Sequence, residues 1–456
     1  MKNRIILLLT LCLSFICVDA EELKSGSSVE KEMYAEKVKN AFRKAWNAYK
    51  EYAWGLDAVN PISKKGHNWY AEPLLMTPID AYSTMCIMGL EKEKKEAKEL
   101  IFGRLNFDKD LEIQQFEIAI RIMGGLLSSY QLDGDLRFLQ LAEDLAKRMM
   151  PVFESPTGMP YRLVNLRTGK VSGEVTNPCE IGSMLLEYGM LSKLTNKPEY
   201  YEKCKRGVVA VFERRAPKTN LVGTNINVET GEWTNKDAHI GACIDAYYEY
   251  LLKGWLLFGD KDLKNMWDIC KKGITDYLSD ECETGYWYGH ADMETGERTR
   301  TVFGALDCFY GAVLCLDKDI KAAKKLQASI NKMWNMYGLE PEAIDYTNMK
   351  VLAPYYMARP EAIEANYYLW HFTKDKQYYE MGKTMFDAIE KNCQIDNGYV
   401  QIKDVRTMEK WDTLESFFFA ETLKYCYLYF APKGAFSLDK CVLNTEAHPF
   451  FKTWKN

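Results

Sequence analysis

A helical pattern that recurs about every sixty residues constrains the fold of this chain more than any other feature of its sequence. In each copy a short polar turn separates an apolar helix from an amphipathic one. The turns lie at residues 129–135, 194–198, 258–262, 316–319 and 372–375. At this spacing the 456-residue chain holds roughly seven helix hairpins, which either stack into an open solenoid or close into an α/α barrel.

The two helices of a hairpin differ in a way that favours the closed form. Residues 118–127 and 417–430 are apolar on nearly every side, whereas residues 142–147 mix apolar and charged side chains. A helix that is apolar all round must be buried on both sides, and an inner ring within an outer amphipathic ring achieves this. The sequence therefore predicts an all-α fold, an (α/α)7 barrel.

The segments that join successive hairpins are long and rich in glycine and proline. Residues 156–171, 222–237 and 285–296 have the composition of short β-hairpins, with a turn at residues 227–231. We expect these β-hairpins at one rim of the barrel.

The N-terminus has the pattern of a secretory signal. Lys2 and Arg4 precede an apolar run over residues 5–16, which is too short to span a bilayer. We expect a cleaved signal peptide at residues 1–20, a polar linker at 21–34 and one barrel domain at 35–452, with an uncleaved anchor as the alternative. The protein would then be exported, to the periplasm or medium in a bacterium or to the ER lumen and secretory pathway in a eukaryote, without a stable membrane span.

Composition excludes several classes of function. The net charge is -5, so no basic excess points to nucleic acid. The sequence has no GxSxG, P-loop or HExxH motif, and its five histidines are dispersed, which argues against a histidine-based metal site. Eleven cysteines follow the predicted signal without a CxxC pair, so neither a disulfide framework nor a zinc site is indicated.

The candidate functional residues are carboxylates within apolar helices. Glu117 and Arg121 stand four residues apart in a helix that otherwise reads as buried. A buried ion pair that fixes helix register explains this pair equally well. Asp245 and Glu361, however, show the same placement at the starts of other apolar helices.

Further acids repeat the pattern, at Glu180, Glu342, Glu364 and Glu415. A single first-turn acid is explained by the helix macrodipole. Several of them, each at the start of an inner helix, would converge at one end of a barrel. A pocket ringed with carboxylates and aromatic residues is typical of glycosidases, which need one protonated acid and one carboxylate base.

Long motifs then resemble a known family. Residues 41–62, 116–130, 242–252, 359–361, 414–430 and 444–449 together resemble the class I α-1,2-mannosidases, glycoside hydrolase family 47. Residues 155–161, 240–242 and 398–406 are similar to the ER-degradation-enhancing mannosidase-like branch. The resemblance covers residues 35–450 and implies an (α/α)7 barrel with inverting, calcium-dependent, exo-acting α-1,2-mannosidase activity on mannose-rich oligosaccharides or glycoprotein glycans.

The resemblance also implies roles for individual residues. Glu117 matches the proton donor, Asp245 and Glu361 match the two carboxylates that activate water, and Glu342 matches another catalytic acid. Thr445 matches the calcium ligand, through its carbonyl and hydroxyl. The remaining matches hold the waters of the ion or the sugar hydroxyls, or pair with the acid: Arg121, Glu180, Glu364, Glu415 and Glu446.

Some positions depart from the family pattern. Cys243 replaces an arginine that contacts outer sugars in the processing enzymes, which leaves linkage and branch preference open, and Ser83 replaces a usual acid. A glycan-binding quality-control factor with little turnover is the main alternative function. Another α/α-barrel glycosidase or a polysaccharide lyase is a third. The mannosidase hypothesis requires residues 117, 245 and 361 to face one common hollow.

Overall fold

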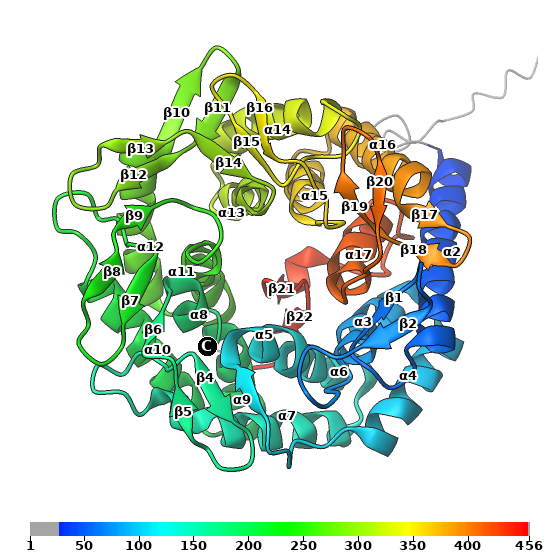
Figure 1. Cartoon of the computed structure of the whole chain (residues 1–456), viewed down its shortest axis with the longest axis horizontal. Helices are drawn as coiled ribbons and strands as arrows, with labels where there is room; N and C mark the ends of the chain where they lie inside the picture. The colour runs from blue at the N-terminus through cyan, green and yellow to red at the C-terminus, as the bar shows by residue number, and fades with distance from the viewer. Residues whose placement is uncertain (1–26, 455–456) are drawn as a thin grey trace, which may run out of the picture.

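The computed structural model describes residues 27–454 as two concentric rings of helices (Figure 1). The inner ring is built from seven segments: α3 (Met76–Met88); α5 (Gln115–Glu117), η1 (Ile118–Met123) and α6 (Gly124–Asp133); α8 (Pro178–Gly182) and α9 (Leu185–Thr195); α11 (Asp245–Phe258); η4 (Leu306–Phe309) and α13 (Tyr310–Leu316); α15 (Glu361–Thr373); η5 (Phe418–Thr422) and α17 (Leu423–Leu428). Each segment contacts the next, and α3 contacts η5, so the ring closes. The predicted barrel is confirmed.

The outer ring holds the amphipathic helices: α2 (Ser28–Tyr52), α4 (Glu91–Arg104), α7 (Leu136–Met149), α10 (Glu199–Glu213), α12 (Lys261–Gly273), α14 (Ile320–Asn335) and α16 (Lys376–Cys393). In α3 every residue except Cys86 is buried, whereas α7 buries one face only. The difference between all-round apolar and one-sided helices therefore decides which ring a helix joins.

Six of the seven helix pairs are hairpins, and the seventh joins the two ends of the chain. Helix α2, the first described helix, packs against α17, the last inner helix. The ring of Tyr34 lies 4.9 Å from that of Phe430, and the ring of Phe42 lies 5.3 Å from that of Phe419. The N-terminal helix therefore closes the outer ring.

The boundary expected at residue 35 is wrong in the structure, because α2 begins at Ser28. Ser27 caps this helix by accepting from the backbone N–H of Glu30, and Tyr34 is buried. Residues 28–34 therefore belong to the barrel rather than to a linker. The predicted signal peptide at residues 1–20 and residues 21–26 lie outside the described residues.

Inner helices lead into outer helices through short polar turns. Gly134 ends α6 and Gly259 ends α11, each in the left-handed conformation. Asp135 and Asp260 follow and cap the next outer helix through their side chains. Glycine avoids the Cβ clash of that conformation, and aspartate satisfies free N–H groups of the next helix. We call this end of the barrel the short-turn rim.

Outer helices lead into the next inner helix through longer connections that hold short antiparallel strands, and we call that end the strand rim. The pairs and triplets are β1 (Ala58–Asn60) and β2 (Lys65–His67); β3 (Glu112–Gln114), β4 (Leu163–Asn165) and β5 (Val171–Ser172); β6 (Val175–Thr176), β7 (Asn225–Asn227) and β8 (Trp233–Asn235); β9 (Asp237–Ala238), β12 (His290–Asp292) and β13 (Arg298–Arg300); β10 (Ser279–Cys282) and β11 (Gly285–Tyr288); β14 (Val302–Gly304), β15 (Ala343–Asp345) and β16 (Lys350–Ala353); β17 (Gln394–Ile395) and β18 (Gly398–Tyr399); β19 (Gln401–Asp404) and β20 (Glu409–Trp411).

Two of the three predicted β-hairpins are confirmed, and one is wrong. Residues 222–237 contain the pair β7–β8, and residues 156–171 contain β4 and the first residue of its partner β5, one residue short of the observed hairpin. Residues 285–296 instead contain strands of two different sheets, because β11 pairs back with β10 while β12 pairs with β13 and β9. The two-residue turn before Gly285 sets that register, so the hairpin lies earlier in the chain than predicted.

A C-terminal hairpin fills the centre of the barrel. Strands β21 (Cys441–Leu443) and β22 (Pro449–Phe451) lie inside the inner ring and contact α11 and α6 (Figure 1, red). The tip of this hairpin, residues 444–448, is buried apart from Thr445. It therefore forms part of the barrel interior.

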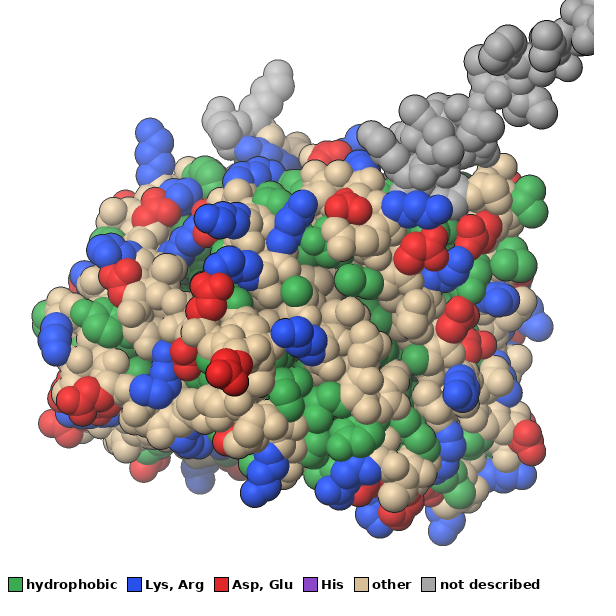
Figure 2. Space-filling view, turned by 90° about the horizontal axis from the view of Figure 1, so that it is seen from above, with side chains coloured by type: hydrophobic (Ala, Val, Ile, Leu, Met, Phe, Trp, Pro, Cys, Tyr) green, Lys and Arg blue, Asp and Glu red, His purple; other side chains and the backbone are tan. Residues whose placement is uncertain are grey.

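The outer surface carries charges of both signs. On the face in Figure 2, Lys and Arg side chains alternate with Asp and Glu side chains. Among the described residues, no helix is both long enough and apolar enough to cross a bilayer.

Candidate active site

The first cavity, which we call the inner cavity, opens at the strand rim and has a volume of about 450 Å³. The starts of several inner helices, the strand-rim connections and the tip of the C-terminal hairpin line it. Its titratable and metal-ligating side chains include most of the predicted site: Glu117, Arg121, Glu180, Asp245, Glu361, Thr445 and Glu446. Residues 117, 245 and 361 therefore face one common hollow.

Glu117 and Arg121 form the predicted ion pair across one helical turn. Arg121 Nε donates to Glu117 Oε2 at 2.9 Å, and Arg121 Nη1 is bonded to Glu446. Arg121 Nη1 also lies 3.7 Å from Oδ2 of the fully buried Asp80. Only Glu117 of these carboxylates is substantially accessible, with 24% of its side chain exposed. The arginine therefore holds Glu117 at the cavity wall, where it can meet a ligand.

Three predicted residues do not line the inner cavity. Glu342 forms a two-point ion pair with Arg359, with Nη2 to Oε1 at 2.8 Å and Nε to Oε2 at 3.2 Å, and Arg359 lines the cavity in its place. Glu364 is buried and accepts from the hydroxyl of Tyr425 at 2.8 Å. Glu415 accepts from Trp69 Nε1 at 3.2 Å.

The two candidate bases lie half-buried at the starts of inner helices. Asp245 is the first residue of α11, and burial raises its pKa to about 7. Glu361 is the first residue of α15, and burial also raises its pKa. Glu361 Oε2 has no hydrogen-bond partner among the described residues. A carboxylate oxygen left unpaired in this way is available to a water or a ligand.

The backbone before Asp245 is strained. Cys243 has a φ of 77°, and its carbonyl oxygen accepts from the backbone N–H of Cys179 at 2.9 Å. A left-handed conformation is unfavourable for a residue with a Cβ, and strain of this kind concentrates at functional sites. The hydrogen bond joins the starts of α8 and α11 and places both cysteines on the cavity wall.

Several contacts fix the tip of the C-terminal hairpin. Asn444 Nδ2 donates to the carbonyl of Ile120 at 3.0 Å and to Glu187 Oε1 at 2.8 Å. The ring of His448 lies 2.9 Å from Asp80 Oδ1, and the backbone N–H of Thr445 donates to Tyr250 at 3.2 Å. The Thr445 carbonyl and hydroxyl oxygens form no hydrogen bond with the described residues. They border a cavity rich in carboxylates, which fits a hard cation that prefers oxygen ligands.

Glu421 is a cavity residue that the sequence interpretation missed. It lies in η5, lines the inner cavity, and burial raises its pKa well above the usual range. The signal was present, because Glu421 is an acid within the apolar stretch 417–430, as Glu117 is within its own helix. Both η1 and η5 are π-helical turns, which are frequent at functional sites.

Two of the dispersed histidines come together with an aspartate at the strand rim. Ligand atoms of Asp237, His239 and His290 lie within 4.8 Å of one another. The backbone N–H of Gly241 donates to His239 Nδ1, so His239 Nε2 carries the proton and donates to Thr224. Arg300 is paired with Asp237. His239 therefore has no lone pair left for a metal, and the cluster is a hydrogen-bonded network.

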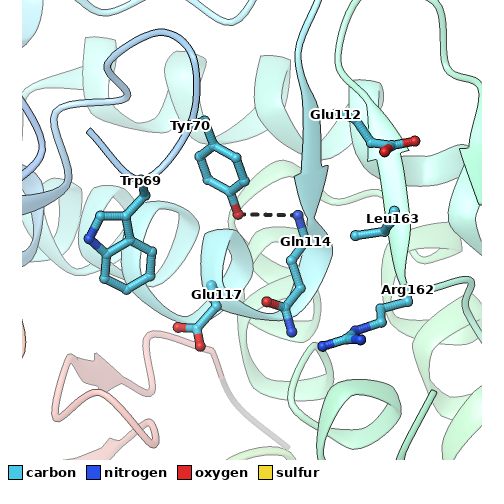
Figure 3. Close-up of a pocket in the computed structure, with 7 residues that line it drawn as sticks. All are labelled: Trp69, Tyr70, Glu112, Gln114, Glu117, Arg162 and Leu163. Carbon is cyan, nitrogen blue, oxygen red and sulfur yellow. Dashed lines mark hydrogen bonds between the residues drawn. The ribbon is translucent and has the colours of Figure 1, made fainter. Parts of the chain in front are cut away.

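A second cavity of about 470 Å³, the outer cavity, adjoins the first. Trp69, Tyr70, Glu112, Gln114, Glu117, Arg162 and Leu163 line it (Figure 3). Gln114, Glu117 and Arg162 line both cavities. Glu117 therefore stands between two adjacent binding spaces.

Comparison with known proteins agrees with the fold. The profile of glycosyl hydrolase family 47 matches residues 41–452. A mannosyl-oligosaccharide 1,2-alpha-mannosidase of Arabidopsis thaliana is 35% identical over 439 residues, which cover 91% of this chain and 78% of that protein. The ER degradation-enhancing alpha-mannosidase-like protein 2 of Homo sapiens is 34% identical over 463 residues, with coverages of 93% and 78%.

Solved structures lead to the same family. The alpha-1,2-mannosidase from Trichoderma reesei superposes with a TM-score of 0.85 at 28% identity, over 92% of this chain and 99% of that chain. A cellobiose 2-epimerase from Bacillus thermoamylovorans, at a TM-score of 0.58 and 10% identity over 88% of this chain and 99% of that chain, shares the fold alone. The chain therefore belongs to glycosyl hydrolase family 47 and is a glycoside hydrolase of the alpha-mannosidase type.

Proposed function

We propose that this protein is an exo-acting, inverting, calcium-dependent α-mannosidase that removes terminal α-1,2-linked mannose from mannose-rich oligosaccharides or glycoprotein glycans. The observation that carries the proposal is the convergence of Glu117, Asp245 and Glu361 on the inner cavity. The C-terminal hairpin fills the barrel centre. A pocket with such a floor admits the end of a glycan rather than its middle, which supports the exo mode.

In this mechanism Glu117 donates the proton to the departing oxygen. Its accessible carboxyl at the junction of the two cavities supports that role, because the bond to be cleaved would lie between a terminal sugar in the inner cavity and its neighbour. Arg121 orients the carboxyl through its ion pair. Glu117 is then reprotonated from solvent after each turnover.

Asp245 or Glu361 accepts a proton from the attacking water. The unpaired Oε2 of Glu361 favours Glu361, since that atom has an open acceptor position. An inverting enzyme places this water between base and sugar, and no covalent intermediate forms. Glu342 contributes by holding Arg359 at the wall, so we assign it a positioning role.

Calcium fits the oxygen donors of the hairpin tip. Thr445 would hold the ion through its carbonyl and hydroxyl oxygens, with Glu180 and Glu446 of the cavity wall holding waters or sugar hydroxyls around it. Glu364 and Glu415 would support this shell from outside the cavity, through Tyr425 and Trp69. When bound, the ion supplies a Lewis acid that can grip neighbouring hydroxyls of a mannose. The sequence also leads us to propose export through residues 1–20, which N-terminal sequencing of the mature protein would test.

Turnover of α-1,2-mannobiose tests the proposed function. For an inverting enzyme we expect release of mannose, and NMR should show that the β-anomer forms first. Tight binding of the disaccharide without hydrolysis would instead favour a lectin-like quality-control factor. Release of the α-anomer would contradict inversion while leaving hydrolysis intact.

A further inference from the structure

Glu340 is a fully buried acid that does not line the inner cavity. It lies in the connection between α14 and β15. Its Oε1 has no hydrogen-bond partner among the described residues, and its Oε2 has only the thiol of Cys308, whose sulfur lies 3.8 Å away. A carboxyl group with so few partners is costly to bury, so its place in the interior needs a chemical explanation.

The charges around Glu340 keep it protonated. Burial raises its pKa well above the usual range, and the carboxylates of Glu361 and Glu342 raise that pKa further. Arg359 has the opposite effect, but its guanidinium is already held by Glu342 in the two-point ion pair. A buried carboxyl whose negative charge is not balanced by a cation takes up a proton instead.

The contacts of Glu340 place this proton on Oε1. Because the Cys308 thiol donates to Oε2, Oε2 is the acceptor oxygen of the carboxyl and Oε1 is its hydroxyl. A protonated carboxyl carries one O–H donor, and a buried donor without an acceptor is unfavourable. Glu340 therefore needs an acceptor within the protein interior.

Glu361 offers the missing acceptor. It lines the inner cavity, but its Oε2 is covered by protein and has no partner among the described residues. Of the charges around Glu340, that of Glu361 acts on it most strongly. The element η4, which carries Cys308, also packs against α15, which begins with Glu361. Two neighbouring buried carboxyls are thus each left with one unpaired oxygen.

We propose that Glu340 is a positioning residue for the base: its carboxyl O–H donates to the covered oxygen of Glu361, directly or through one enclosed water, and so holds Glu361 in its ionised form. This inference rests on the proposed function, since it takes Glu361 as the base. A base must be ionised before it can accept a proton; burial opposes this ionisation, and a donor restores it. A carboxylate oxygen has two lone pairs, so one remains for the attacking water.

The pH dependence of kcat/KM on α-1,2-mannobiose tests the inference, because its acidic limb reports the ionisation of the base in the free enzyme. Glu340→Met keeps the length of the side chain but removes the donor, so Glu361 should ionise less readily. The acidic limb should then move to higher pH by about one pH unit, which is about a tenfold loss of kcat/KM at a fixed pH on that limb. Glu340→Gln keeps an N–H donor and should retain the wild-type limb.

Gln327→Met provides the matched control. Gln327 is a fully buried residue of α14 with an unpaired amide, and it does not line the inner cavity. Its replacement should leave the acidic limb as in the wild type. A limb that moves to lower pH in both Glu340 variants, that stays in place in Glu340→Met, or that moves equally in the control would overturn the inference. The other ionisable groups that act on Glu361 are the same in every variant: Arg359, Glu342, Glu364, Glu421, Cys308 and Tyr356.

Unfolding measurements separate failure of this inference from failure of the proposed function. A Glu340 that keeps its proton in the folded chain releases it on unfolding above the ordinary pKa of glutamate, so the wild type should lose stability relative to Glu340→Gln as the pH rises. Between pH 5.5 and 7.5 the ratio of their unfolding equilibrium constants should change about tenfold per pH unit. A wild type without turnover disproves the mannosidase proposal but leaves this measurement valid. A ratio that does not change with pH would overturn the inference even in an active enzyme, and it decides the question if Glu340→Met does not fold.

Discussion

The two rims of the barrel are built by the same helices but differ in chemistry. The strand rim holds the inner cavity, whose wall carries Glu117, Asp245 and Glu361. The short-turn rim has a cavity of about 290 Å³ whose wall includes Leu256, Leu316 and several other apolar side chains. Inner helices all run from the strand rim to the short-turn rim, so their N-termini, which favour anions, meet at one end only. The direction of the helices thus explains why acids collect at the strand rim.

The largest expected effect comes from removing the proposed acid at the strand rim. Glu117→Gln should lower kcat on mannobiose by roughly 10²- to 10⁴-fold, because proton donation is lost while the shape is kept. The matched change at the other rim is Asp439→Asn, which removes an exposed carboxylate paired with His371. That variant should keep wild-type turnover. If Glu117→Gln hydrolysed mannobiose as fast as the wild type, the proposed difference in function between the two rims would be wrong.

Metal removal is the next test. Excess chelator should abolish hydrolysis, and added Ca²⁺ should restore it, because the oxygen donors at Thr445 suit a hard cation. Thr445→Val removes the hydroxyl at similar volume and should raise the Ca²⁺ concentration needed for half-maximal thermal stabilisation. Full activity in chelator, or the same Ca²⁺ dependence in Thr445→Val, would contradict the proposed ion site.

His239 should make the strand rim sensitive to acid. Burial lowers the pKa of His239 to about 3, so the unfolded chain takes up a proton below pH 6.5 that the folded chain does not. This contribution to stability is complete above that pH and is lost as the pH falls. Between pH 7.5 and 5.5 the wild type should lose about 1.4 kcal/mol more unfolding free energy than His239→Gln. If the unfolding free energies of the wild type and of His239→Gln changed equally with pH, His239 would not be a buried neutral imidazole.

The smallest expected effect concerns the turns of the short-turn rim. Gly134 has a φ of 82° and open space around its Cα, so Gly134→Ala should cost about 1 kcal/mol through the left-handed backbone alone. Gly103 also has open space but lies within helix α4, so Gly103→Ala should stabilise by about 0.5–1 kcal/mol. Urea denaturation measures both. If both substitutions changed the free energy of unfolding by the same amount, the left-handed backbone would not explain the destabilisation at residue 134.

The sequence predicted the parts of the fold that depend on local pattern. All-round apolar helices such as residues 118–127 could only be inner helices, and the turns at residues 134 and 259 carry the glycine–aspartate signal of a helix end. The closing contact between α2 and α17 could not be predicted in this way, because no local pattern pairs residue 34 with residue 430. The prediction of a single hairpin at residues 285–296 was wrong partly because β12 pairs with β9, a strand more than fifty residues earlier in the chain.

The candidate site shows a similar division. The acids at residues 117, 245 and 361 were found because a carboxylate is out of place in an apolar helix. Glu421 has the same signal and was missed. Glu342 resembled a catalytic acid, yet its side chain pairs with Arg359 and does not line the inner cavity, since side-chain direction depends on the partner that the fold supplies.

The sequence by itself determined that the chain forms alternating inner and outer helices, and that acids stand at the starts of inner ones, because burial and helix-end preferences are written in local residue order. Only the tertiary structure decided which acids share the inner cavity, that Arg162 joins it to a second cavity, and that the hairpin tip at Thr445 lies at its wall. Those relations depend on ring closure, which brings residues hundreds of positions apart into contact.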